Sequence, residues 1–472
     1  MAGRDIELDS RPVELSSGTD AAATVSESSR DHSPPSPEDG RQAFSLPPVD
    51  GGKDAWLFLA ACFSIEALVW GFPFAFGVFQ DYYSTHEPFV GSSNIAVIGT
   101  CSMGIMYLTS PLIMGLIRLC GRWARWAPLF GLFIMCISLA MSSFSSNVTH
   151  LIVTQGVFYA IGGGIAYCPC ILYMDEWFVQ RKGLAYGIMW SGTGLAGVVF
   201  PLLLEFLLHS LGFRSTLRLW SGVLFALTFP LACYIKPRVP YSATTHVRPF
   251  DSKIFMMPSF WLYQLGNVVE AMGFFLPGIY LPTYARSTLG AESYSSATTI
   301  LLVNVASVFG CVAMGYLIDR LDVTTCILLS TIGATIGALV IWGLSSSLPL
   351  LYFFCVVYGL FAGSYTSAWP GIMKDVVGKA EVAGQAYLDP SMIFGWLAAG
   401  RGIGNVVSGP LSDSLIRGLP WRGDTAAYGY GSGYGALIVF TGVTAFLGGA
   451  SFALAAEEGS VQSEAWTPSL PA

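Results

Sequence analysis

The chain has 472 residues, of which 53% are hydrophobic and 11% are charged, and its formal net charge is −7. Soluble domains carry about 25% charged residues, so this composition excludes an ordinary soluble protein. The negative net charge excludes nucleic-acid binding. The ten cysteines lie in apolar blocks and not in the spacing of a secreted disulfide scaffold.

Residues 1–53 are predicted to form a disordered N-terminal tail, because they are rich in Ser, Pro and acidic residues, with Phe44 as their one aromatic residue. Apolar blocks follow, and each is long enough to cross a bilayer, which takes about 20 helical residues. The twelve blocks are 56–79, 94–119, 127–144, 151–174, 184–208, 217–235, 260–284, 298–318, 324–344, 350–372, 391–415 and 434–454.

A polar linker at 236–258 divides these blocks six and six, and residues 456–472 form a short C-terminal tail. The fold class expected is therefore an all-α membrane protein with twelve transmembrane helices in two six-helix bundles, at 54–235 and 259–455. With the N-terminus in the cytosol, the inside loops hold twelve Lys and Arg residues against five outside. Both termini are predicted to be cytosolic, in a multi-pass protein of the plasma membrane. The sequon at Asn147 would face outward as a candidate glycosylation site.

The two halves share short patterns in the same chain order. Glu66-Ala67 with Pro73 reappears as Glu270-Ala271 with Pro277, and the glycine run beginning at Gly192 reappears 208 residues later. Two parallel halves of this kind are a common carrier architecture, with the solute site at mid-membrane between them.

Three ionisable residues lie near the middle of predicted spans: Glu66, Glu270 and Arg401. A charge at this depth costs at least about 2.5–3.5 kcal/mol, so each should face a cavity or a partner. The functional interpretation is a site where a glutamate binds a proton or solute and Arg401 supplies the counter-charge. The alternative is a structural ion pair between the halves.

Small residues allow helices to approach closely in lipid. The predicted conformational glycines are Gly192, Gly194, Gly402 and Gly404. They would lie where the two halves move against each other, and static packing is the alternative.

Several motifs resemble the monocarboxylate porter family of the major facilitator superfamily. Asp50-Gly51-Gly52 followed by Trp56 is similar to one family signature, and WFVQRKGLA at 177–185 is similar to the second. The resemblance covers about residues 50–454 and implies a proton-linked carrier that works by alternating access. Lactate carriers of that family have cations where this chain has Phe74 and Cys311, which argues against a lactate-like substrate. Arg118 stands where the superfamily pattern has an acid.

The chain lacks the sequence signatures of hydrolases, metalloproteases and P-loop enzymes, so we expect no enzyme activity, no cofactor and no metal. The main hypothesis is a monomeric exporter of a secondary metabolite or weak organic acid, driven by an ion gradient. Protons are the candidate coupling ion. A proton-coupled importer of monocarboxylates or nutrients is the alternative, and a carrier-fold sensor is a third. The candidate cavity or gating residues are Phe74, Pro73, Pro277, Tyr280, Cys311, Trp369 and Asn405.

Overall fold

A computed structural model describes residues 46–92, 94–239, 250–384, 388–423 and 427–464. The predicted tail at 1–53 thus lies mostly outside the described residues, as does the middle of the 236–258 linker. In the described part of the chain every regular element is a helix.

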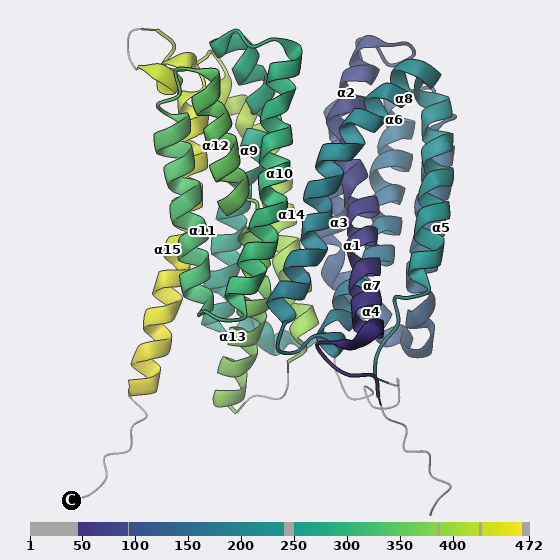
Figure 1. Cartoon of the computed structure of the whole chain (residues 1–472), viewed down its shortest axis with the longest axis vertical. Helices are drawn as coiled ribbons and strands as arrows, with labels where there is room; N and C mark the ends of the chain where they lie inside the picture. Colours follow the sequence, from purple (N-terminus) through teal and green to yellow (C-terminus); the bar gives the residue numbers. More distant parts are fainter. Residues whose placement is uncertain (1–45, 93, 240–249, 385–387, 424–426, 465–472) are drawn as a thin grey trace, which may run out of the picture. The chain divides into compact units, whose positions relative to one another are not determined.

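The predicted spans of the first half coincide with helices (Figure 1). The main helices are α1 (Gly52–Phe74), α2 (Phe76–Thr85), α3 (Ile95–Leu108), α4 (Ser110–Cys120), α5 (Ala127–Ser142), α6 (Val148–Leu151), α7 (Tyr159–Trp177) and α8 (Lys182–Ala232). Two predicted spans fall within α8, which is broken at Gly212. The φ of Gly212 is 72°, a left-handed conformation that glycine adopts without a steric penalty.

The predicted spans of the second half also coincide with helices. The main ones are α9 (Pro258–Leu289), α10 (Ser293–Ile318), α11 (Val323–Ile336), α12 (Leu348–Phe361), α13 (Trp369–Val382), α14 (Pro390–Ile416) and α15 (Gly435–Glu464). Helix α15 continues to Glu464, past the predicted end of the last span at 454.

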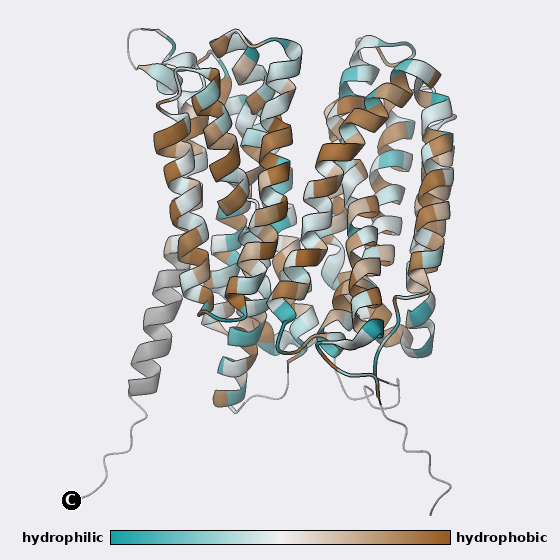
Figure 2. Ribbon diagram, in the orientation of Figure 1, coloured by the Kyte–Doolittle hydropathy of each residue, from teal (hydrophilic) through white to brown (hydrophobic). Residues whose placement is uncertain are grey.

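Among the described residues, seven helical segments are long and apolar enough to cross a membrane. They are Gly52–Thr85, Ser110–Ser142, Val148–Trp177, Lys182–Ala232, Ser293–Ile318, Val323–Trp342 and Leu348–Val382. Large apolar side chains such as Phe130, Phe133 and Phe353 are more than half exposed, which suits contact with lipid. Figure 2 shows hydrophobic residues along outer helices such as α5 and α11.

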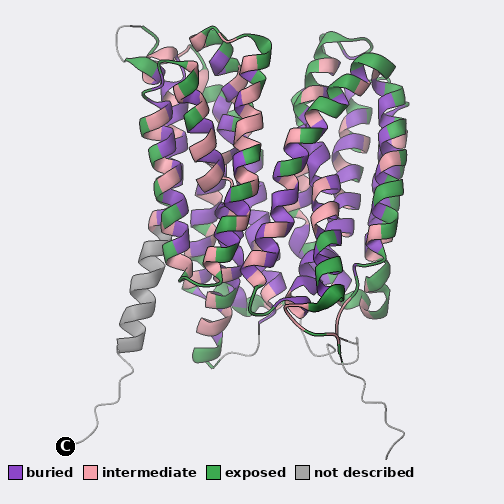
Figure 3. Ribbon diagram, in the orientation of Figure 1, coloured by how far each residue is buried: buried purple, intermediate pink, exposed green. Residues whose placement is uncertain are grey.

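The helices of the first half, α1–α8, form one group, and those of the second half, α9–α15, form the other. The two groups meet in two places: α8 packs on α10, and α3 and α4 pack on α14. Buried residues concentrate on the inner helices (Figure 3). The most apolar window of the Val148–Trp177 segment is 78% buried, against 28% for Ser293–Ile318. Helix α7 therefore lies inside its group, whereas α10 combines a contact face with an exposed face.

Candidate functional site

A cavity lies between the two groups of helices, with walls from both. It holds about 780 Å³ not filled by atoms, part of it open to solvent. The first half contributes Glu66 and Trp70 from α1, Tyr167 from α7, and Trp190 and Thr193 from α8. The second half contributes Phe274 from α9, Asn304 and Cys311 from α10, Trp369 from α13, and Phe394 and Arg401 from α14.

Glu66 is a buried acid in this wall, with a side chain that the fold leaves only 3% exposed. The Thr193 hydroxyl donates to Glu66 Oε1 at 2.6 Å, and the Tyr167 hydroxyl lies beside the same carboxyl. None of the ion pairs of the described residues includes Glu66. The carboxyl is therefore held by neutral hydroxyls, with no basic side chain to balance its charge.

Arg401 is balanced by Glu270. Arg401 Nη1 lies 2.8 Å from Glu270 Oε2, and both side chains are buried. The guanidinium also lies over the Phe274 ring, 4.3 Å from its centroid, a cation–π contact. Arg401 lines the cavity and Glu270 does not, because Glu270 packs toward α15 beside Gly448.

The three deep charges thus separate into two sites. Glu66 and Arg401 share the cavity as the sequence predicted, whereas Glu270 lies behind Arg401. The ion pair joins α9 to α14 inside the second half, so the alternative of a pair between the halves was wrong in its placement. The transport and coupling roles of these three residues stay predictions.

An aromatic cluster joins the halves at the cavity. Trp190 of α8 stacks on Phe394, with ring centroids 6.0 Å apart, and meets Trp369 edge-on at 6.1 Å. Trp190 Nε1 donates to the Tyr167 hydroxyl at 3.1 Å. Trp369 was a sequence candidate; the contact of these rings across the halves was not predicted, because spacing along a helix does not indicate which way a ring points.

Tyr107 is a further residue that sequence reasoning missed. Its ring packs on Trp70, with centroids 4.4 Å apart, and its hydroxyl faces Arg401. Tyr107 belongs to α3, so it links the first half to the cation of the second. The signal that could have indicated it is the small residue opposite, Gly402, whose added Cβ would lie 2.8 Å from Tyr107 Cβ.

The other cavity and gating candidates divide into two groups. Phe74 and Cys311 line the cavity, so the two positions where lactate carriers have cations are apolar or thiol surfaces in this wall. Pro73 and Pro277 are buried inside α1 and α9 and are not part of the wall.

Tyr280 and Asn405 lie away from the cavity wall. The Tyr280 hydroxyl donates to Asp413 Oδ1 at 2.9 Å, between α9 and α14. Asn405 is buried on α14, with its amide oxygen near Gly104 of α3.

Two of the four predicted conformational glycines lie between the halves. An added Cβ on Gly194 would lie 2.9 Å from Val308 of α10, and Gly402 meets Tyr107. Gly192 packs on Phe63 of α1 and Gly404 on Ala271 of α9, both within their own halves. Gly192 and Gly404 therefore do not lie at the contact between the halves, since glycines two positions apart on a helix face different neighbours. The conformational role of all four glycines stays a prediction.

Asn147 begins α6, and its exposed side-chain oxygen accepts the His150 N–H at 2.9 Å. Its glycosylation stays a prediction. The described residues contain no group of three or more His, Cys, Asp or Glu able to hold a metal ion.

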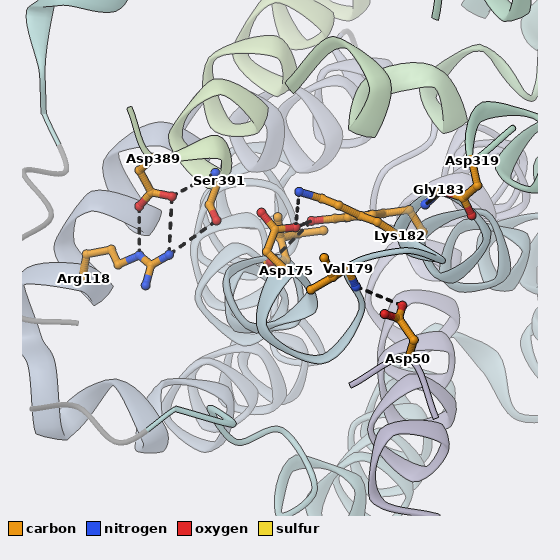
Figure 4. A network of polar contacts seen from close by, with 11 residues as sticks. Asp50, Arg118, Asp175, Val179, Lys182, Gly183, Asp319, Asp389 and Ser391 are labelled. Atoms are coloured by element: carbon orange, nitrogen blue, oxygen red, sulfur yellow. Dashed lines mark hydrogen bonds and ion pairs between the residues drawn. The ribbon is translucent and has the colours of Figure 1, made fainter. Parts of the chain in front are cut away.

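The two halves are joined by a polar network at the helix ends near Asp50, Arg118, Asp319 and Asp389, called below the Asp50 end (Figure 4). The Asp50 carboxylate accepts the backbone N–H groups of Val179, Gln180 and Arg181 at 2.9–3.0 Å. The two segments that carry the family resemblance are therefore bonded to each other.

Asp319, at the end of α10, accepts the N–H groups of Gly183 at 2.6 Å and Leu184 at 2.9 Å. These are unpaired donors of the first turn of α8, whose own N-cap residue makes no side-chain bond. Asp319 therefore caps α8 from the opposite half. Burial raises the pKa of this carboxyl above its usual range, while the two backbone bonds act in the opposite direction.

Arg118, at the end of α4, makes the second bridge between the halves. Arg118 Nε lies 3.1 Å from Asp389 Oδ2, and Asp389 is itself the N-cap of α14, where it accepts the Ser391 N–H at 3.0 Å. Arg118 thus has an ion-pairing role in this closure, although the superfamily pattern has an acid at its position.

The chain has clear relatives among known proteins. A family model described as the Major Facilitator Superfamily matches residues 57–409, about three quarters of the chain. The chain is 25% identical over 429 residues to MFS transporter asaE of Aspergillus flavus, covering 89% of this chain and 90% of the relative. It is 26% identical over 407 residues to the Aspyridones efflux protein apdF of Emericella nidulans, covering 84% and 78%. It is 25% identical over 343 residues to the Fujikurins efflux protein of Gibberella fujikuroi, covering 70% of each. These relatives are transporters and efflux proteins, not enzymes.

Proposed function

Since the chain belongs to the major facilitator superfamily, and is thus a multi-pass membrane transporter of small organic solutes, we propose that it exports a hydrophobic secondary metabolite by alternating access. The observation that carries the proposal is the cavity between the halves, with its buried Glu66, its aromatic walls and its closure at the Asp50 end. Two relatives named as efflux proteins of fungal metabolites support the outward direction.

We propose further that the described helices make twelve crossings in two six-helix bundles, as in the monocarboxylate porter family. The break at Gly212 supports two crossings within α8. Helices α9 and α14 are long enough to cross but carry Glu270 and Arg401, which lower their hydropathy, so composition alone undercounts them. The basic residues of the loops support a cytosolic location for the Asp50 end, and we propose that the protein is a monomer of the plasma membrane.

In this arrangement, the structure corresponds to a state closed toward the cytosol. Export requires the opposite state, in which α8 separates from α10 and α4 separates from α14 at the Asp50 end. The bonds of Asp319 and the Arg118–Asp389 pair are then broken, and the solute enters from the cytosolic side. Reforming them closes that side behind the solute.

Glu66 is the proposed coupling residue. A buried carboxyl that accepts from the Thr193 hydroxyl and pairs with no cation binds a proton from one side of the membrane and releases it on the other, as the cavity alternates. Arg401 has a different proposed role, because its charge is already balanced by Glu270. It holds Phe274 and Tyr107 in the cavity wall.

A monocarboxylate importer is disfavoured by the same wall. An anionic solute would meet an uncompensated carboxylate at Glu66, and an arginine already paired at Arg401. Phe74 and Cys311 add no positive charge to the lining.

The proposal is tested by deleting the gene in its host and comparing metabolites in cells and medium by mass spectrometry. Deletion should cause an endogenous metabolite to accumulate in cells and disappear from the medium, and the wild-type gene should reverse this. Glu66→Gln should lower export about tenfold or more, which corresponds to about 1.4 kcal/mol. Glu205→Gln is the matched control, since Glu205 is exposed on α8 outside the cavity wall and should restore export. Unchanged metabolite distribution on deletion would contradict export.

A further inference from the structure

The charge balance of the cavity indicates which solutes it accepts. Arg401 is within 2.8 Å of Glu270 and is covered by the Phe274 ring, so its charge is already satisfied inside the second half. An anion that bound Arg401 would have to compete with a buried carboxylate held at contact distance. If an anion displaced Glu270 from Arg401, the buried Glu270 carboxylate would be left without a counter-charge, which is strongly unfavourable.

Glu66 offers the opposite charge without a competitor. Its Oε1 accepts from Thr193, whereas no N–H or O–H of the described residues is in hydrogen-bonding geometry with Oε2. The residue is 3% exposed and lines the cavity. A buried polar atom without a partner is costly, and a bound ligand with an N–H group would satisfy it.

Aromatic side chains line the same cavity as this carboxyl. Trp70 is one helical turn after Glu66 on α1, and its ring packs on Tyr107 at 4.4 Å and on Tyr167 at 5.7 Å. Trp190, on the other side, donates to Tyr167. Aromatic faces close to an acid favour a cation, because the ring quadrupole and the carboxylate both attract positive charge.

We propose that the cavity selects flat aromatic solutes that carry a protonated amine, with the ammonium bound to Glu66 and the ring body between Trp70 and the Trp190 cluster. The inference rests on the proposed function, since it names the substrate class of that site. A proton and the ammonium compete for the same carboxylate. Protonation of Glu66 from the outer side therefore releases the cation there, and deprotonation toward the cytosol allows the next cation to bind.

The test uses the purified full-length protein in nanodiscs and three probes with one ring system: aminoacridine, acridine and acridine carboxylate. Their binding is followed by the fluorescence polarisation of the probe at neutral pH. The cation should bind at least about tenfold more tightly than the carboxylate, a difference of about 1.4 kcal/mol. Glu66→Gln should remove this preference and leave the affinity for neutral acridine unchanged, while Glu205→Gln should keep the preference.

Trp70→Leu gives a second, independent variant in case Glu66→Gln does not fold. It should weaken aminoacridine several-fold more than acridine, because only the cation loses a cation–π contact. The proposal is overturned if the carboxylate binds as tightly as the amine, if the preference survives in Glu66→Gln, or if none of the three probes binds.

Flux of the same probes in liposomes separates this inference from the proposed function. Flux without charge preference would reject the amine class and keep the exporter. Charge-selective binding without flux would reject the exporter and keep the class of ligand.

Discussion

The two closures at the Asp50 end occupy corresponding places in the two halves, yet they are built differently. At the start of α8, the capping carboxylate is Asp319 and comes from the opposite half. At the start of α14, the cap is Asp389 of the same segment, and the residue that reaches across is Arg118. Both helices therefore have a carboxylate at their N-terminus. When the halves separate, α8 loses its carboxylate because Asp319 belongs to the other half, whereas α14 keeps Asp389.

The free-energy cost of opening is therefore different at the two places. Separation of α8 from α10 uncaps a helix and leaves two N–H donors to water. Separation of α4 from α14 breaks an ion pair and leaves the α14 cap intact. The Asp319 closure is therefore the stronger of the two. Arg118, a base where the superfamily pattern has an acid, forms the weaker one through its ion pair with Asp389.

The largest effect is expected from Asp319→Ala. Loss of a helix cap costs up to about 2 kcal/mol, so the closed population relative to the open one should fall roughly 30-fold. The measurement is pulsed EPR between spin labels at exposed Trp123 and Leu321, one in each half, with exposed Cys120 and Cys233 replaced by Ser. The control is Asp322→Ala, since Asp322 begins α11 and makes no side-chain cap bond. A distance distribution like that of the wild type in Asp319→Ala would contradict the stronger role of this closure.

A smaller effect is expected from Arg118→Ala. The Arg118 side chain is 20% exposed, so its ion pair should contribute about 1 kcal/mol, and the closed population should fall roughly fivefold. Asp389→Ala should lower the closed population by about the same factor, because the α14 cap that it also removes is present in both the closed and the open state. The same EPR distance reports both, with exposed Arg122→Ala as the control. A clearly larger shift in Asp389→Ala than in Arg118→Ala would contradict this, since it would show that the α14 cap is lost on opening.

The smallest effect is a pH dependence of the first closure. Burial raises the pKa of Asp319 in the closed state, whereas in the open state the carboxyl is in water at about 3.9. The closed state therefore binds the proton more tightly. Lowering the pH through the interval between the two pKa values should increase the closed population in the wild type and not in Asp319→Asn. An opening of the wild type on acidification would show that the backbone bonds outweigh burial.

Much of the fold could be predicted from the sequence. Hydrophobic length predicted where the long helices lie, because the bilayer fixes how many apolar residues a crossing needs, whereas the count of twelve crossings stays a prediction. The repeat around Glu66 and Glu270 predicts two related halves, which stays a prediction. The break at Gly212 within continuous helix, and the extension of α15 to Glu464, depend on local geometry that hydrophobicity does not report.

The sequence indicates how deep the charged residues lie in the membrane, but not which side of the helix each one occupies. Counting residues from a membrane face places Glu66, Glu270 and Arg401 at one level, yet only Glu66 and Arg401 face the cavity. The side of the helix that each charge occupies depends on its neighbours across the bundle, such as Gly448 beside Glu270. The capping of α8 by Asp319 likewise exists only once the two halves are packed.

The most direct test of alternating access measures both ends of the molecule at once. One spin-label pair reports the Asp50 end, at Trp123 and Leu321, and a second reports the opposite end, at Leu211 and Tyr294, all of which are exposed. The measurement compares the wild type with Asp319→Ala in nanodiscs. Alternating access predicts that the first distance lengthens while the second shortens. If the first pair separates and the second does not move, or both lengthen together, the two halves do not rock about the cavity and the mechanism is contradicted.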